Sequence, residues 1–153
     1  MRKKLLVVLA IVFVLIQFIR SPKNNGKAFT STDVTHYLIV PDSILSILKV
    51  SCFDCHSNHT NYPWYSYINP VSWWLNDHIQ EGKREVNFSD FSKYTKEEID
   101  KKLKETIDMV KRDVMPLKSY LLIHTDAKLT KQQIQKIVKW AQTERQRLRQ
   151  DLY

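Results

Sequence analysis

Glycine and cysteine are scarce in this chain of 153 residues, which contains two of each. Gly26 and Gly82 are too few to build a glycine-rich phosphate-binding loop, and their scarcity argues against most architectures of sheets and tight turns. The chain also lacks a basic and aromatic RNA-binding motif. We therefore expect no nucleic acid partner, although the net charge of +8 would suit one.

Both cysteines lie in one short motif, Cys52-Phe53-Asp54-Cys55-His56. The pattern C-x-x-C-H is the attachment signature of a c-type haem. Two thiols at this spacing can both reach the vinyl groups on one edge of a porphyrin and form thioethers. The histidine that follows is then held under the iron as an axial ligand through a neutral imidazole nitrogen. The motif predicts haem c bound covalently to Cys52 and Cys55, with the iron ligated by His56.

Three other interpretations of the cysteines remain open. A thioredoxin-like redox pair needs a βαβ context, which the sequence does not show. A zinc site would use Cys52, Cys55, His56 and His59, but H-x-x-H is shorter than the usual spacing, and a ligand directly after Cys55 is awkward for a tetrahedral ion. A plain disulfide is conceivable in an oxidising compartment, but it leaves His56 unexplained.

One long apolar run occurs at the N-terminus, where Leu5 to Ile19 is interrupted only by Gln17 and follows Arg2-Lys3-Lys4. Fifteen helical residues cover roughly 22 Å, short of the roughly 30 Å hydrocarbon core, but flanking basic side chains can snorkel. Residues 20–28 offer no A-x-A-like cleavage site, so we predict an uncleaved transmembrane signal anchor over residues 1–20. The positive-inside rule then predicts a single-pass protein of the cytoplasmic membrane, with its domain in the periplasm or on the outer side.

Beyond this run the pattern predicts a polar tether over residues 21–38 and one helical domain over residues 39–148. Capping boxes at Thr95-x-x-Glu98 and Thr130-x-x-Gln133 begin two helices, the first running to about residue 111. Asn69-Pro70 predicts the N-cap and first position of another helix, near residues 70–84. Apolar residues recur at helical spacing in all three, and no strand pair is evident. The predicted fold class is all-α, a small cytochrome c-like helical domain behind a single N-terminal transmembrane helix.

A haem iron held by His56 has a second axial position, for which Met115 is the best candidate. Met115-Pro116 follows the end of a helix, and the proline stops the helix so that the thioether is presented from a loop. His78, on the apolar face of the 70–84 helix, is the alternative ligand, whereas His124 is assigned a structural role. The aromatic cluster between Tyr62 and Trp74 is predicted to form core and pocket wall.

Four longer stretches of the chain carry a family resemblance. They are CFDCHSNHTNYPWYSYINPVSWWL (52–75), DHIQEGKREVNFSDF (77–91), VMPLKSYLLIH (114–124) and LTKQQIQKIVKW (129–140). These stretches resemble the bacterial haem-binding domain family, which has a c-type cytochrome CxxCH motif, and the resemblance extends over about residues 40–145. It implies covalent haem on Cys52 and Cys55 with His56 as proximal ligand. The M-P-x-x-x-Y segment from Met115 to Tyr120 resembles the sixth-ligand loop of small cytochromes c.

Together these observations predict a membrane-anchored monohaem c-type cytochrome that transfers electrons on the outer side of the cytoplasmic membrane. The basic net charge suits an acidic redox partner protein. The alternative is a peroxidase-like or ligand-sensing haem protein, which needs an open sixth iron position. The sequence shows no separate acid–base pair for catalysis, so an electron carrier is favoured over an enzyme.

Overall fold

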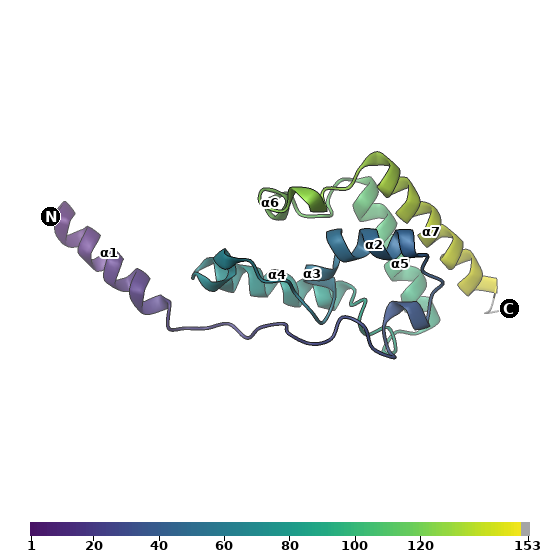
Figure 1. Cartoon of the computed structure of the whole chain (residues 1–153), viewed down its shortest axis with the longest axis horizontal. Coiled ribbons are helices and arrows are strands. Elements are labelled where there is room, and N and C mark those ends of the chain that lie inside the picture. The colour runs from purple at the N-terminus through teal and green to yellow at the C-terminus, as the bar shows by residue number, and fades with distance from the viewer. Residues whose placement is uncertain (151–153) are drawn as a thin grey trace.

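The structure, a computed structural model that describes residues 1–150, consists of helices joined by irregular segments (Figure 1). The α-helices are α1 (Arg2–Ile16), α2 (Asp42–Ser51), α3 (Phe53–His56), α4 (Val71–Glu85), α5 (Lys96–Lys111), α6 (Lys118–Leu121) and α7 (Lys131–Gln150). Short 3-10 turns form η1 (Val34–His36), η2 (Trp64–Tyr67) and η3 (Thr125–Ala127). Residues 1–150 contain no strand, only an isolated antiparallel bridge between Asn25 and His59. The all-α prediction is therefore confirmed.

Both predicted capping boxes form. The Thr95 hydroxyl accepts a hydrogen bond from the Glu98 backbone N–H at 3.2 Å, and the Glu98 carboxylate accepts one from the Thr95 N–H at 2.9 Å. Thr130 and Gln133 exchange the equivalent bonds ahead of α7, at 3.2 and 2.8 Å. Each box satisfies two backbone donors that the first turn leaves without an intrahelical partner. The starts of α5 and α7 therefore follow directly from local sequence.

The end of α1 is tied to the residues ahead of α4. The Asn69 side-chain amide donates to the carbonyl oxygens of Ile16 and Ile19, both at 2.7 Å. The Gln17 side chain accepts from the Asn69 N–H at 2.9 Å and donates to the Asn69 carbonyl at 3.1 Å. Asn69 thus serves the end of α1, and α4 begins after Pro70 without a side-chain cap. The predicted N-cap role of Asn69 is wrong.

Helix α1 ends three residues before the apolar run of residues 5–19 does. The helix ends at Ile16, where Asn69 and Gln17 engage the backbone, so its 15 residues rise about 22 Å against roughly 30 Å of hydrocarbon. Among residues 1–150, no helix combines the length and apolar character needed to cross a membrane. The predictions of a transmembrane helix over residues 1–20 and of a single-pass protein of the cytoplasmic membrane are therefore wrong. The predicted periplasmic or outer-side placement, which rested on that helix, loses its basis.

The apolar core lies where α2, α5 and α7 meet, and Figure 1 shows α5 and α7 packed against each other. Leu48 of α2 and Ile137 of α7 are fully buried. Three buried rings extend the core toward α3, because Phe88 stacks on both Phe53, at a centroid distance of 5.6 Å, and Phe91, at 6.1 Å. The core therefore reaches the helix that carries C-x-x-C-H.

Arginine side chains of α7 form ion pairs beside this core. Asp100 of α5 accepts hydrogen bonds from Arg145 at 2.8 Å and from Arg149 at 3.0 Å. The buried carboxylate of Glu144 accepts from the Arg147 guanidinium at 2.9 Å and from the Ile39 N–H at 3.1 Å. These bonds fix α7 against α5 and against the chain ahead of α2.

The polar segment over residues 21–38 lies against the domain. The buried Asn24 side chain donates to the Ser57 carbonyl and to the Thr60 hydroxyl, both at 2.9 Å. The Val34 N–H donates to the Phe88 carbonyl at 2.8 Å. The division of the chain into residues 1–20, 21–38 and 39–148 stays a prediction.

Candidate functional site

Residues 53–56 of the C-x-x-C-H motif form α3, a single helical turn, and Cys52 is the residue that joins it to α2. The His56 N–H donates to the Cys52 carbonyl at 2.9 Å, which brings both cysteines and the histidine onto one turn. Both cysteines are free thiols, so the structure has no disulfide between them. Burial raises the pKa of Cys52 to about 12 and that of Cys55 to about 11. The two sulfurs are therefore protonated at neutral pH and resist oxidation.

The imidazole of His56 is prepared for ligation. Its Nδ1 lies 3.1 Å from the Val86 carbonyl oxygen, which can only accept, so Nδ1 carries the proton and Nε2 keeps its lone pair. Burial lowers the pKa of His56, although hydrogen bonds to the Val86 and Gly82 carbonyls and the charge of Glu85 oppose that effect. A neutral imidazole with a free Nε2 is the form that binds haem iron. This donor set fits a haem.

Both glycines of the chain lie against the motif segment. A Cβ on Gly82 of α4 would stand 2.7 Å from the Cys55 carbonyl oxygen, and one on Gly26 would stand 2.8 Å from the Asn58 carbonyl oxygen. Neither distance leaves room for a side chain, and both obstacles are backbone atoms. Glycine is therefore required for the close approach of α4 and of the 21–38 segment to residues 55–58.

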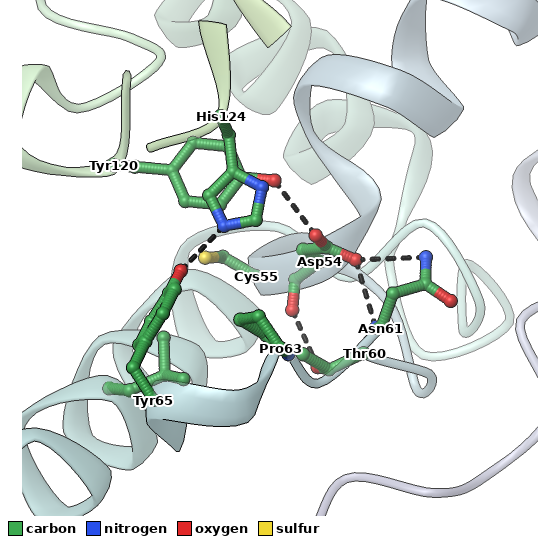
Figure 2. A pocket seen from close by; sticks show the side chains of 9 residues that line it. Asp54, Cys55, Thr60, Asn61, Pro63, Tyr65, Tyr120 and His124 are labelled. Atoms are coloured by element: carbon green, nitrogen blue, oxygen red, sulfur yellow. Dashed lines mark hydrogen bonds between the residues drawn. The ribbon is translucent and has the colours of Figure 1, made fainter. Parts of the chain in front are cut away.

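A polar cluster surrounds Cys55 beside a small cavity (Figure 2). The Tyr120 hydroxyl donates to the Asp54 carboxylate at 2.8 Å, and the Tyr65 hydroxyl is hydrogen-bonded to His124 Nε2 at 2.6 Å. The rings of Tyr120 and His124 stack with centroids 4.1 Å apart. Burial, followed by the hydrogen bond to Asp54, raises the pKa of Tyr120, so its hydroxyl remains a donor. The cavity is lined by Asp54, Cys55, Thr60, Asn61, Pro63, Tyr65, Leu75, Tyr120 and His124.

The structure brings the segment that follows Met115 to the motif. After α5 ends, Asp113 adopts a positive φ of 55°, so the chain leaves the direction of that helix. The half-buried Met115 lies two residues further on. Tyr120, five residues further on, bonds to Asp54 between the two cysteines. Ligation of iron by Met115 stays a prediction.

His78 also keeps a free ring nitrogen. Its Nδ1 lies 2.9 Å from the Trp74 carbonyl oxygen, and its ring lies 4.2 Å from that of Trp74. His78 therefore remains the alternative sixth ligand. His59 likewise directs Nδ1 to a backbone carbonyl, that of Gly26 at 3.1 Å. Within residues 1–150 no group of three or more His, Cys, Asp or Glu side chains is arranged to hold a metal ion, so the zinc alternative gains no support.

Sequence reasoning missed the link between Asp54 and Tyr120. The two residues are 66 positions apart, and the only available signals were the carboxylate inside C-x-x-C-H and the tyrosine in M-P-x-x-x-Y. The aromatic cluster was predicted to be core and pocket wall. Tyr65 does line the cavity, but Trp64 and Tyr67 are 74% and 54% exposed.

Comparison with known proteins shows that residues 11–143 match the haem-binding domain family. The chain belongs to the haem-binding domain family. No curated protein and no solved structure matches the chain. Membership of the haem-binding domain family establishes haem as the ligand, and the neutral His56 beside two free thiols fits it.

Proposed function

We propose that this haem-binding domain is a monohaem c-type cytochrome that transfers electrons to an acidic redox partner protein. The observation that carries the proposal is the His56 Nδ1–Val86 hydrogen bond, because it leaves Nε2 available for iron inside a C-x-x-C-H turn with two free thiols. When bound, the haem supplies an iron that alternates between the ferrous and ferric states.

Each residue of the motif has one task in this proposal. Cys52 and Cys55 would hold the haem covalently, each through a thioether made by addition of its S–H across one vinyl group, without net oxidation. Their raised pKa values keep them as thiols until then. His56 would hold the iron through Nε2, because the Val86 carbonyl fixes the orientation of the ring and raises its basicity.

Met115 is the proposed sixth ligand, and a thioether there raises the reduction potential relative to a second histidine. Support comes from the Tyr120–Asp54 bond, which holds the M-P-x-x-x-Y segment on the motif helix. The net charge of +8 favours an acidic partner, because complementary charge speeds diffusional encounter.

The first test is haem-dependent peroxidase staining on a denaturing gel, after expression with the cytochrome c maturation machinery. We expect a stained band for the wild-type protein and none for Cys52→Ala/Cys55→Ala. Absence of stain in well-expressed wild-type protein would contradict covalent attachment.

The second test compares the visible spectra of Met115→Ala and His78→Ala. Loss of the ferric iron–thioether charge-transfer band only in Met115→Ala supports the assignment of the ligand. Met109→Ala is the matched control, since Met109 is a half-buried methionine inside α5. A five-coordinate wild-type spectrum with rapid carbon monoxide binding would instead favour the peroxidase-like or ligand-sensing alternative.

A further inference from the structure

The segment over residues 114–124 is held in place by polar contacts more than by burial. Helix α6 buries none of its residues, and Leu122 and Ile123 are 81% and 62% exposed. Buried positions occur on either side of α6, at Pro116 and at Ala127. Since apolar packing between these points is slight, the position of the segment depends on the hydrogen bonds that it makes.

Two hydrogen bonds connect this segment to the motif and its surroundings (Figure 2). Tyr120 donates to Asp54, and His124 pairs with Tyr65 of η2. The stacked rings of Tyr120 and His124, inclined by 11°, couple the two bonds. Of the two, only the Tyr120 bond reaches α3, the helix that contains Cys55 and His56.

Asp54 is a rigid acceptor. Its second carboxylate oxygen accepts from the Asn61 N–H at 3.0 Å and from the Asn61 side-chain amide at 3.2 Å. Its backbone carbonyl accepts from the Thr60 hydroxyl. These bonds orient the carboxylate independently of Tyr120, and a hydrogen bond to a charged acceptor is stronger than one between neutral groups.

We infer that Tyr120 is a positioning residue that keeps Met115 on the iron through the hydrogen bond that its hydroxyl donates to Asp54. The inference rests on the proposed function, in which haem is attached through α3 and Met115 is the sixth ligand. Because Asp54 lies between Cys52 and Cys55, the bond fixes the Met115 segment to the same turn that fixes the haem. Asp54, the residue just before Cys55, would thereby influence Met115, the proposed second ligand of the iron.

The test is ligand displacement on ferric haem-loaded protein. Tyr120→Phe removes the hydroxyl and keeps the ring that stacks on His124. Imidazole added from solution must displace Met115, so we expect its apparent affinity to rise about 10- to 100-fold in this variant. The iron–thioether charge-transfer band should weaken in parallel.

Tyr37→Phe is the matched control. It makes the same substitution at a tyrosine whose ring lies 6.5 Å from that of Phe91 and whose backbone carbonyl accepts from Arg147 of α7. Its imidazole affinity should equal that of the wild-type protein. Asp54→Asn, which replaces the charged acceptor by a neutral one, should raise the affinity in the same direction as Tyr120→Phe and provides the measurement if Tyr120→Phe fails to accumulate.

The outcomes separate the two proposals. An unchanged imidazole affinity in Tyr120→Phe, with covalent haem and the thioether band intact, overturns the positioning role and leaves the proposed function standing. Lower unfolding stability without a change in affinity also overturns it, because a merely structural bond would give that result. Covalent haem without a thioether band in the wild-type protein rejects Met115 and with it the inference. Absence of covalent haem rejects the proposed function itself.

Discussion

Gly82→Ala tests the packing of the motif helix on α4. The added Cβ would stand 2.7 Å from the Cys55 carbonyl oxygen, about 0.7 Å inside the 3.4 Å at which ordinary contact begins. Overpacking of this kind costs about 1–3 kcal/mol, whereas alanine regains up to about 1 kcal/mol of helix propensity. We expect a net loss of about 1–2 kcal/mol in the free energy of unfolding, because the obstacle is backbone and cannot rotate away.

Urea unfolding followed by circular dichroism measures this loss. Gln80→Ala, an exposed change on the same helix, is the control for helix propensity and should leave stability nearly unchanged. If haem is attached covalently as proposed, Gly82→Ala should also reduce the amount attached, since α3 contains Cys55 and begins directly after Cys52. If Gly82→Ala were as stable as the wild-type protein or more so, the requirement for glycine at this contact would be refuted.

Three further predictions concern charged and titratable groups. Burial acts to raise the pKa of Asp100, but Arg145 and Arg149 outweigh it and lower the pKa. The ionised Asp100 therefore stabilises the fold fully at pH values above its pKa in the unfolded chain, and this stabilisation is lost as pH falls through its lower pKa in the folded protein. In urea titrations, the free energy of unfolding of Asp100→Asn should fall below that of the wild-type protein at neutral pH and approach it in acid. Urea unfolding of Glu144→Ala should show a loss of about 1.5–3 kcal/mol in the free energy of unfolding, because the bonds to Ile39 and Arg147 are removed. Glu144→Gln, which keeps an acceptor oxygen, should lose less. At pH 8 the folded haem-free protein should react with iodoacetamide at Cys55 about 100-fold more slowly than the unfolded chain, because its pKa is raised from 9.0 to about 11; equal rates would contradict this burial.

The sequence predicted those parts of the fold that depend on near neighbours. The capping boxes at Thr95 and Thr130 began helices as expected, because each involves residues three positions apart. The buried stripe of α5, with Ile99 and Leu103, followed from periodicity for the same reason.

Contacts between distant residues account for the errors. Asn69 carries the local pattern of an N-cap, yet its amide bonds to carbonyl groups some 50 positions earlier. These hydrogen bonds form where α1 ends, at Ile16. The prediction of a transmembrane helix required the apolar run to stay helical as far as Ile19. Composition and periodicity carry no information on such partners.

The sequence predicted the C-x-x-C-H motif of the candidate site, but not the residues that hydrogen-bond to the motif and orient it. Nothing local to His56 indicated that Val86, 30 positions later, would orient its ring. The same holds for Asp54 and Tyr120. The roles of Cys52, Cys55, His56 and Met115 as haem-binding residues stay predictions until the spectra are measured.

The unequal distribution of apolar burial has a consequence for cooperativity. Helices α5 and α7 share the core, whereas α6 buries none of its residues. Hydrogen exchange should therefore divide the chain into a protected unit around the core and a segment near α6 that opens locally at much lower free energy. If Met115 ligates the iron as proposed, local opening of that kind would free a coordination site while the remainder of the protein stays folded, so global stability and access to the iron would vary independently.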